Sequence, residues 1–328
     1  MRLQNQTPFP AHLLTVDLPD EHFVRAVVLS KATYDLTAEG MLVPSLAQMP
    51  VALEPLVTPF GTFHGEVFPK KDGVDVCVLG TLSRSTPASG VDVVVRVGPY
   101  VHRVRVVGDR HWRRTEAGLV PSRPAPFTTM PLGYSRAYGG RAKGEHGEVT
   151  WTDNPDGIGF YLREEDAENN PLPNLEAADA PPPAAWNEHA PVAGLGPYPM
   201  FWGLRAREGL RLGDDHALAH IGPRVFNVAH PDMVVPSLEP GAAVSIDNVR
   251  DAPVRFELPH TRAHVVCWTA QERVDAPAAI DGVFVWLDAA RVVITQRAHF
   301  HYVIRKGEPR GALITLVDAE PWSPPGGL

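Results

Sequence analysis

Alternating hydrophobic and polar residues recur along much of this chain and predict β-strands. Residues 23–36 (FVRAVVLSKATYDL) predict a long strand, and the following TAEG and MLVP predict a turn and a returning strand. Residues 90–97 and 101–108 form two alternating, valine-rich arms joined at Gly98, which predict a hairpin. Residues 74–83 are more continuously apolar and predict a central strand buried on both faces.

Strand patterns return in the last third of the chain, near residues 242–249, 253–259, 263–270, 282–296 and 312–319. The sequence LDAAR within the fourth of these predicts a tight turn between two arms of another hairpin. Evidence for helix is limited to residues 213–222, where two helical turns are predicted to end at Gly222.

Between residues 121 and 222 the alternation gives way to a segment rich in proline. The segment also carries six large aromatic residues, which disordered linkers seldom contain: Trp151, Phe160, Trp186, Tyr198, Phe201 and Trp202. We therefore predict an ordered strap packed on the scaffold. The expected fold is mainly β, with antiparallel sandwich-like or barrel-like units, a long Pro-rich strap and very little helix. The units are an N-terminal β unit (1–120), the strap (121–222) and a C-terminal β unit (223–328), and the two β units could form one continuous domain.

Composition and charge narrow the class of protein. The 28 glycines and 34 prolines among 328 residues favour short strands and rigid connections over a helical fold. A net charge of −8 and a pI near 5.9 argue against binding nucleic acid. Cys77 and Cys267 lie in apolar runs and are interpreted as buried thiols. Because no signal-peptide pattern and no apolar run of about 18 residues occurs, a cytoplasmic location without membrane insertion is expected.

The strongest candidate for a metal site is the pair His299 and His301, which share one face if their segment is a strand. His260 or His264 could supply a third ligand, which would suit a metal-dependent hydrolase. The alternative is an outward-facing pair without metal. The sequence contains no GxSxG elbow and no GxxxxGK[ST] phosphate loop. A further hypothesis is a carbohydrate-binding β module that uses exposed tryptophans such as Trp151, Trp186 or Trp202.

Eight motifs in the same order give the chain a resemblance to the bacterial family catalogued as domain of unknown function 2169. They are NQTPF (5–9), VLSKATYDL (28–36), PKKDGVDVCVLG (69–80), VRVGPYVHRVRVVGDRHW (95–112), PFTTMPLGYSRAYGG (126–140), NPDGIGF (154–160), PLPNLE (171–176) and GLGPYPMFWGLR (194–205). The resemblance implies a cytoplasmic adaptor or chaperone that binds a type VI secretion effector or a PAAR-like spike-tip protein and assists its loading onto the spike. Such a role needs a protein partner, and no catalytic residue, cofactor, metal or small-molecule substrate. The segment near residues 206–232 is shorter than is usual in the family.

The motifs also supply candidate structural or partner-binding residues. The sequence GYSRAYGG predicts a strand with Tyr134, Arg136 and Tyr138 on one face, ended by glycines that can adopt positive φ. We interpret this region as a rigid bracket, with direct contact to the cargo as the alternative. Asp109 is expected to pair with an arginine such as Arg136, and Trp112 to cover the core of the valine-rich hairpin. The full set is Lys31, Asp109, Arg110, Trp112, Tyr134, Arg136, Tyr138, Gly139, Gly140, Asn154, Pro155, Gly157 and Gly159.

Overall fold

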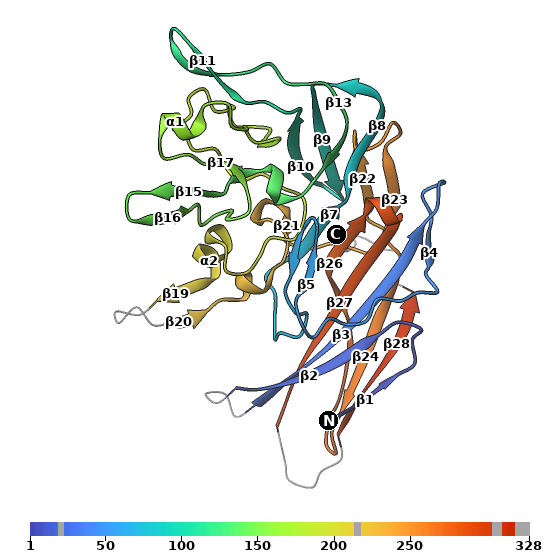
Figure 1. Ribbon diagram of the computed structural model, residues 1–328. Helices are drawn as coiled ribbons and strands as arrows, with labels where there is room; N and C mark the ends of the chain where they lie inside the picture. The colour runs from blue at the N-terminus through green and yellow to red at the C-terminus, as the bar shows by residue number, and fades with distance from the viewer. Residues whose placement is uncertain (19–22, 213–217, 304–309, 319–328) are drawn as a thin grey trace, which may run out of the picture.

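A seven-stranded sheet forms the centre of the molecule (Figure 1). The structure is a computed structural model that describes residues 1–18, 23–212, 218–303 and 310–318. The strand order is β2 (Ala11–Leu18), β3 (Phe23–Leu36), β27 (Arg291–Tyr302), β26 (Ala279–Trp286), β7 (Val74–Leu79) and β21 (Val234–Val235), with β4 (Leu42–Pro44) also paired to β3. Among these pairs β26 and β7 run parallel, whereas β2, β3, β27 and β26 follow one another antiparallel.

A five-stranded sheet contains the valine-rich hairpin, which confirms that prediction. Its order is β18 (Leu175–Ala177), β10 (Tyr100–Val107), β9 (Gly90–Val97), β22 (Ala243–Asp247) and β23 (Val254–Glu257). Gly98 turns the hairpin with a φ of 54°. Along β9 the side chains alternate between buried and less buried, so one face of this sheet lies on the core.

The third sheet has four strands and joins the two ends of the chain. Its order is β1 (Arg2–Asn5), β28 (Gly311–Asp318), β24 (Thr261–Trp268) and β25 (Arg273–Pro277). Buried residues such as Val265 and Ile314 from this sheet pack against Val28 and Phe300 of the seven-stranded sheet. A larger core fills the space among the seven-stranded sheet, the five-stranded sheet and the strap. Sheets therefore pack face to face in two places, and they are mostly antiparallel, with β1–β28 and β26–β7 as parallel pairs.

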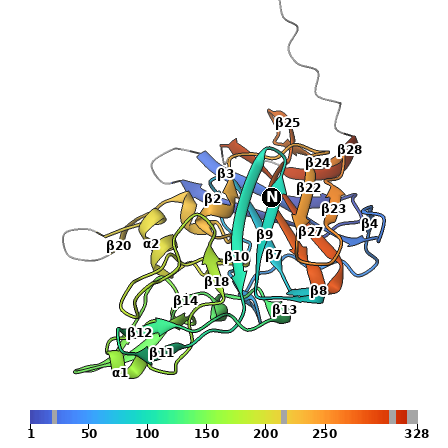
Figure 2. The same cartoon turned by 90° about the horizontal axis from the view of Figure 1, so that it is seen from above.

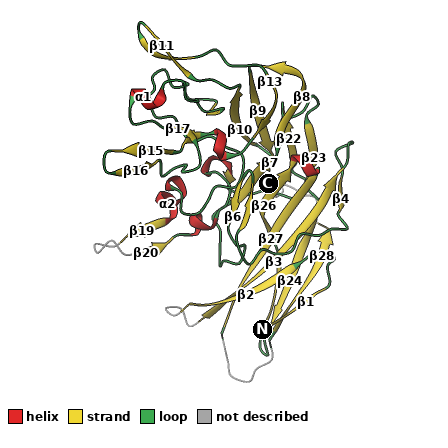
Figure 3. Ribbon diagram, viewed as in Figure 1, coloured by secondary structure: helices red, strands yellow, loops and turns green. Residues whose placement is uncertain are grey.

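Within the described ranges, six short strand pairs and six short helical segments complete the fold (Figure 3). The pairs are β5 (Leu56–Thr58) with β6 (Gly61–Phe63), β8 (Thr81–Ala88) with β13 (Phe127–Pro131), β11 (Trp112–Thr115) with β12 (Gly118–Pro121), β14 (Tyr138–Gly139) with β17 (Ile158–Gly159), β15 (Arg141–Gly144) with β16 (Gly147–Thr150), and β19 (Leu210–Leu212) with β20 (Leu218–Ile221). The helical segments are η1 (Tyr134–Arg136), α1 (Glu164–Ala167), α2 (Gly203–Gly209), η2 (Pro223–Phe226), η3 (Pro231–Met233) and η4 (Leu287–Ala289).

The predicted fold class, mainly β with very little helix, is confirmed. The strap lies beside the five-stranded sheet (Figure 2) and contributes Leu132, Leu195 and Tyr198 to the main core. Strands from before residue 120 and after residue 223 pair within the same sheets, and the division into three units remains a prediction.

The helix predicted within residues 213–222 is wrong where the structure describes it. Leu218–Ile221 form strand β20 because they pair with β19, and the Gly222 N–H donates to the Gly209 carbonyl at 2.6 Å. Residues 213–217 lie outside the described residues. The turn predicted at LDAAR is confirmed, since η4 and Ala290, with a φ of 48°, join β26 to β27.

Candidate functional site

Most of the candidate residues lie in or beside one bracket, which we define as residues 134–140 together with residues 154–160. Asn154 is its centre and has no exposed surface. Its Nδ2 donates to the main-chain oxygens of Tyr134 at 2.9 Å and Tyr138 at 3.1 Å. Its own main-chain oxygen accepts from the Gly140 N–H at 2.8 Å. One buried amide therefore connects both segments of the bracket.

The glycines of the bracket allow these two segments to approach closely. Gly139 and Gly140 have φ values of 146° and 108°. A Cβ on Gly140 would lie 2.6 Å from the main-chain oxygen of Gly157. Tyr138 and Gly139 pair in parallel with Ile158 and Gly159. Gly139 and Gly140 thus adopt positive φ, as the sequence predicted. Pro155 follows Asn154 and lies in a turn.

The predicted strand through GYSRAYGG is wrong. Tyr134–Arg136 form the 3-10 turn η1, in which the Ala137 N–H donates to the Tyr134 oxygen at 3.0 Å, and β14 begins at Tyr138. The chain curves here because the side-chain amide of Asn154 donates to two main-chain oxygens, those of Tyr134 and Tyr138, which are four residues apart. As a result Tyr134 and Tyr138 are buried, whereas the side chain of Arg136 remains 40% exposed.

One buried arginine, Arg110, connects the loop after β10 to β18 of the five-stranded sheet. The buried Arg110 donates through Nη2 to the Pro173 oxygen at 2.7 Å and to Glu176 Oε1 at 2.5 Å. Since both partners of the Arg110–Glu176 pair are only 7% exposed, breaking it would leave an uncompensated buried charge. Arg110 therefore holds the loop that follows β10 against strand β18, which is a structural role.

The predicted Asp109–Arg136 ion pair is present, with 3.6 Å between Asp109 Oδ1 and Arg136 Nη1. Asn174 connects the two, because its Nδ2 donates to Asp109 Oδ1 at 3.0 Å and its Oδ1 accepts from Arg136 at 3.2 Å. The Asp109 side chain is 74% exposed, so this pair adds little stability. The three residues line part of an open groove of about 690 Å³.

Trp112 lies away from the place predicted for it, whereas Lys31 lies on its predicted strand with a partner that the sequence did not indicate. Trp112 is 2% exposed and packs with Leu119, Ala167 and Leu172 in a small separate core, instead of covering the core of the valine-rich hairpin. Lys31 lies on β3, outside the bracket, and its Nζ forms an ion pair with Glu66 at 2.8 Å. Sequence spacing could not identify the contacts of either residue, because the partners come from distant segments.

His299 and His301 lie on the same face of β27, as predicted. The lone pair of His301 Nε2 accepts from Arg25 Nε at 3.1 Å. Burial, and next the charge of Arg297, lower the pKa of His299 to about 4. Across the described part of the chain, no three His, Cys, Asp or Glu residues are close enough together to hold a metal ion. His264 instead contacts Asp275 at 3.3 Å, so the described residues supply no third ligand to the pair.

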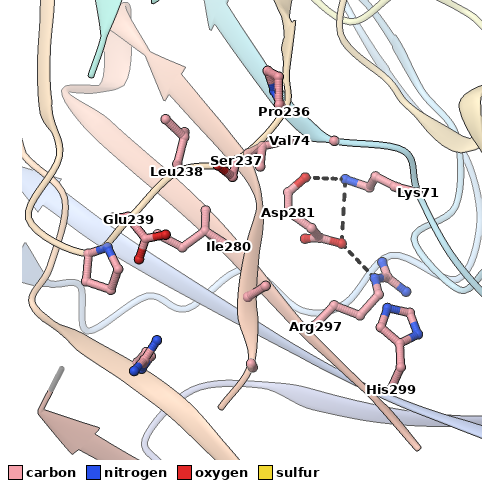
Figure 4. A pocket seen from close by; sticks show the side chains of 15 residues that line it. Lys71, Val74, Pro236, Ser237, Leu238, Glu239, Ile280, Asp281, Arg297 and His299 are labelled. Carbon is pink, nitrogen blue, oxygen red and sulfur yellow. Dashed lines mark hydrogen bonds and ion pairs between the residues drawn. The ribbon is translucent and has the colours of Figure 1, made fainter. Parts of the chain in front are cut away.

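The pocket next to His299 contains a network of buried charges (Figure 4). Lys71 Nζ donates to Asp75 Oδ2 at 2.7 Å and to the Asp281 main-chain oxygen at 2.8 Å, and Arg297 Nε donates to Asp281 Oδ2 at 2.6 Å. Burial alone would raise the pKa of Asp281, but Lys71 and Arg297 outweigh it and lower the pKa to about 2. Two cations, Lys71 and Arg297, contact two carboxylates, Asp75 and Asp281, so the buried charges balance. Such a balanced network is typical of a structural role.

A different surface was missed by the sequence reasoning. Residues 41–57, which we call the apolar segment, display six large hydrophobic side chains to solvent. Their exposed fractions are Met41 59%, Val43 47%, Leu46 104%, Leu53 63%, Leu56 37% and Val57 76%. Glu54 is the only charged residue in the segment. This apolar composition with a single charge was the signal available in the sequence.

The apolar segment is held in place from its inner side. The Gln48 side chain accepts from the Thr33 N–H at 2.8 Å and donates to the Thr33 oxygen at 2.8 Å. Farther along, the Ala52 N–H donates to Glu66 Oε2 at 2.6 Å. These bonds fix the backbone on the seven-stranded sheet, so the hydrophobic side chains are presented outward on an ordered support.

The three tryptophans named for carbohydrate binding are each half-buried. Trp202 packs edge-on against Tyr134 and Tyr198, with ring centroids 5.6 and 5.2 Å apart, and Trp151 packs in the same way against Tyr138 at 5.4 Å. Trp186 is also half-buried and packs beside the small core around Trp112. The expectation of exposed tryptophans at these positions is therefore wrong, because the rings anchor the strap.

No helix among the described residues is both long enough and apolar enough to cross a lipid bilayer. In comparisons with known proteins, residues 22–297 match the profile of a bacterial family described as "Uncharacterized protein conserved in bacteria (DUF2169)". Neither a curated protein nor a solved structure matches the chain.

Proposed function

We propose a function that proceeds from one premise: this chain belongs to the bacterial family DUF2169, whose profile covers residues 22–297. On that premise the protein is a non-enzymatic, cytoplasmic adaptor or chaperone of type VI secretion. It binds an effector or a PAAR-like spike-tip protein and assists the loading of that cargo onto the spike. Its partner is a protein, and no small-molecule substrate takes part.

The apolar segment is the observation that carries this proposal. Solvent-exposed hydrophobic side chains concentrated in one segment are a candidate site of interaction with another protein. Leu46, Leu53 and Val57 are each more than half exposed, and burying one such side chain fully contributes roughly 1.5–3 kcal/mol. A partner that covers several of them gains several kcal/mol, which offsets part of the cost of association.

The rest of the molecule supports a holding role through its rigidity. The bracket is fixed by a fully buried amide, and inside the scaffold the cations Lys71 and Arg297 are balanced by the carboxylates of Asp75 and Asp281. Because the apolar segment is bonded to β3 through Gln48, little ordering entropy remains to be lost when a partner binds.

Co-expression with the products of adjacent genes tests the proposal. An effector or spike-tip protein encoded next to this chain is expected to become more soluble in its presence and to co-purify with it. The double variant Leu46→Glu/Val57→Glu should reduce the recovered cargo at least about tenfold, because two apolar contacts are replaced by charges that must be desolvated.

Val101→Glu is the matched control, because Val101 is 53% exposed but lies on β10, away from the apolar segment. This variant should retain the cargo. Equal cargo recovery by the double variant and the control would remove the apolar segment from the proposal. Absence of any adjacent gene product that binds the wild-type chain would refute the adaptor function itself.

A further inference from the structure

Strand β2 lies at the end of the seven-stranded sheet, beside β3 (Figure 1). It pairs with β3 along its whole length, from Ala11 opposite Ser30 to Leu18 opposite Phe23. Within the described residues no strand pairs with its other edge, and no main-chain hydrogen bond there involves residues 11–18. Among the residues that the structure describes, one edge of this eight-residue strand therefore has no strand partner.

The register shows which main-chain groups face this open edge. The Lys31 N–H donates to the Pro10 oxygen at 2.9 Å, so residues 10 and 31 form a hydrogen-bonded pair. Hydrogen-bonded and non-hydrogen-bonded pairs alternate along an antiparallel ladder. Residues 12, 14 and 16 consequently bond to β3, whereas Ala11, Leu13 and Thr15 direct their N–H and C=O groups outward.

Most of this edge, residues 11–16, lacks the features by which soluble proteins prevent strand pairing, and the one charged residue of β2, Asp17, lies next to the end of the strand. Natural edge strands are kept short, carry lysine or another charge, contain proline, or are interrupted by a bulge. Residues 11–16 (AHLLTV) contain neither proline nor Asp, Glu, Lys or Arg, and their pairing with β3 continues without a register shift. An open row of main-chain donors and acceptors of this kind is complementary to another extended strand.

We infer that β2 pairs antiparallel with β2 of a second copy of this chain, around a two-fold axis at Leu13. The symmetry places Leu13 opposite its own copy, Ala11 opposite Thr15, and His12 opposite Leu14. No like charges meet along this stretch, although each chain carries a net charge of −8. The outward N–H and C=O groups of Ala11, Leu13 and Thr15 are satisfied by the partner copy, and the two central sheets become continuous.

Leu13 explains why the second copy fits this edge. Its side chain packs at the border of the core between the seven-stranded and four-stranded sheets. Around the two-fold axis the two Leu13 side chains meet directly, which extends that core across the interface and removes more apolar surface from water. An isologous interface of this kind closes at two copies and does not propagate into fibres.

The test is the mass of the purified full-length chain in solution, measured by analytical ultracentrifugation over a range of concentrations. The wild-type chain is expected to form a dimer. Thr15→Pro removes an outward N–H from each copy but no hydrogen bond to β3, and it should weaken dimerisation by about tenfold or more. Thr15→Ala keeps the N–H and should dimerise like the wild type. The unfolding temperature of each variant shows whether the monomer remains folded.

Hydrogen exchange on the wild-type chain provides a readout that needs no variant. The amides of Leu13 and Thr15 should become protected as the concentration rises, whereas those of His12 and Leu14 are protected at every concentration by β3. A monomer at all concentrations would overturn the inference, as would a dimer that survives Thr15→Pro or one that leaves the Leu13 amide exchanging freely. The adaptor proposal is unaffected by these results, because it depends on cargo capture.

Discussion

Replacing Asn154 should destabilise the fold more than any change of similar size at the surface. Asn154→Ala removes two hydrogen bonds to the carbonyls of Tyr134 and Tyr138. Each bond contributes about 1 kcal/mol, and a buried carbonyl left without a donor costs about 1 kcal/mol or more in addition. The expected loss is about 3 kcal/mol. With an unfolding entropy of about 2.1 cal/mol/K for each of the 328 residues, the melting temperature should fall by about 4 °C.

Asn154→Asp separates hydrogen bonding from packing. The carboxylate has nearly the same shape, but it cannot donate and faces the oxygens of Tyr134 and Tyr138. We therefore expect it to be at least as destabilising as Asn154→Ala. Urea unfolding followed by circular dichroism gives the free energies, with Asn187→Ala at an exposed position as the control, expected within about 0.5 kcal/mol of wild type. A stability of Asn154→Asp equal to that of the wild type would refute the role assigned to this amide.

Two further predictions concern backbone conformation and pH. Gly140 and Gly118 have φ values of 108° and 107°, but an added Cβ meets the Gly157 oxygen only at position 140. Gly140→Ala should therefore lose about 2 kcal/mol more than Gly118→Ala in the same unfolding assay, and equal losses would contradict the close approach. Burial lowers the pKa of His230 to about 4 from the usual 6.5. Between pH 6.5 and pH 4 the unfolded chain therefore binds more protons at His230 than the folded chain does. The free energy of unfolding should consequently be highest above pH 6.5 and should decline as the pH falls toward 4. His230→Gln should flatten this decline in urea midpoints measured at pH 7 and 4.5, and parallel curves for the two proteins would exclude His230 as its source.

The sequence contained most of the information about strands. Alternation in residues 90–97 and 101–107 specifies β9 and β10, because successive side chains of a strand point to opposite faces and only one face lies on the core. The continuous apolar run at β7 specifies burial on both faces. The glycines and Asn154 also identified the bracket as a place of unusual backbone geometry. These features are local, so they can be read along the chain.

Contacts between distant segments could not be predicted from local patterns in the sequence. Whether GYSRAYGG forms a strand or a 3-10 turn depends on an amide supplied by Asn154, and the ion pair of Lys31 depends on Glu66. The exposure of Leu46 and the open edge of β2 likewise follow from what the rest of the chain leaves uncovered. Side-chain periodicity reports which face of a strand is apolar, but the neighbour that meets that face is chosen by the free energy of the whole packed molecule.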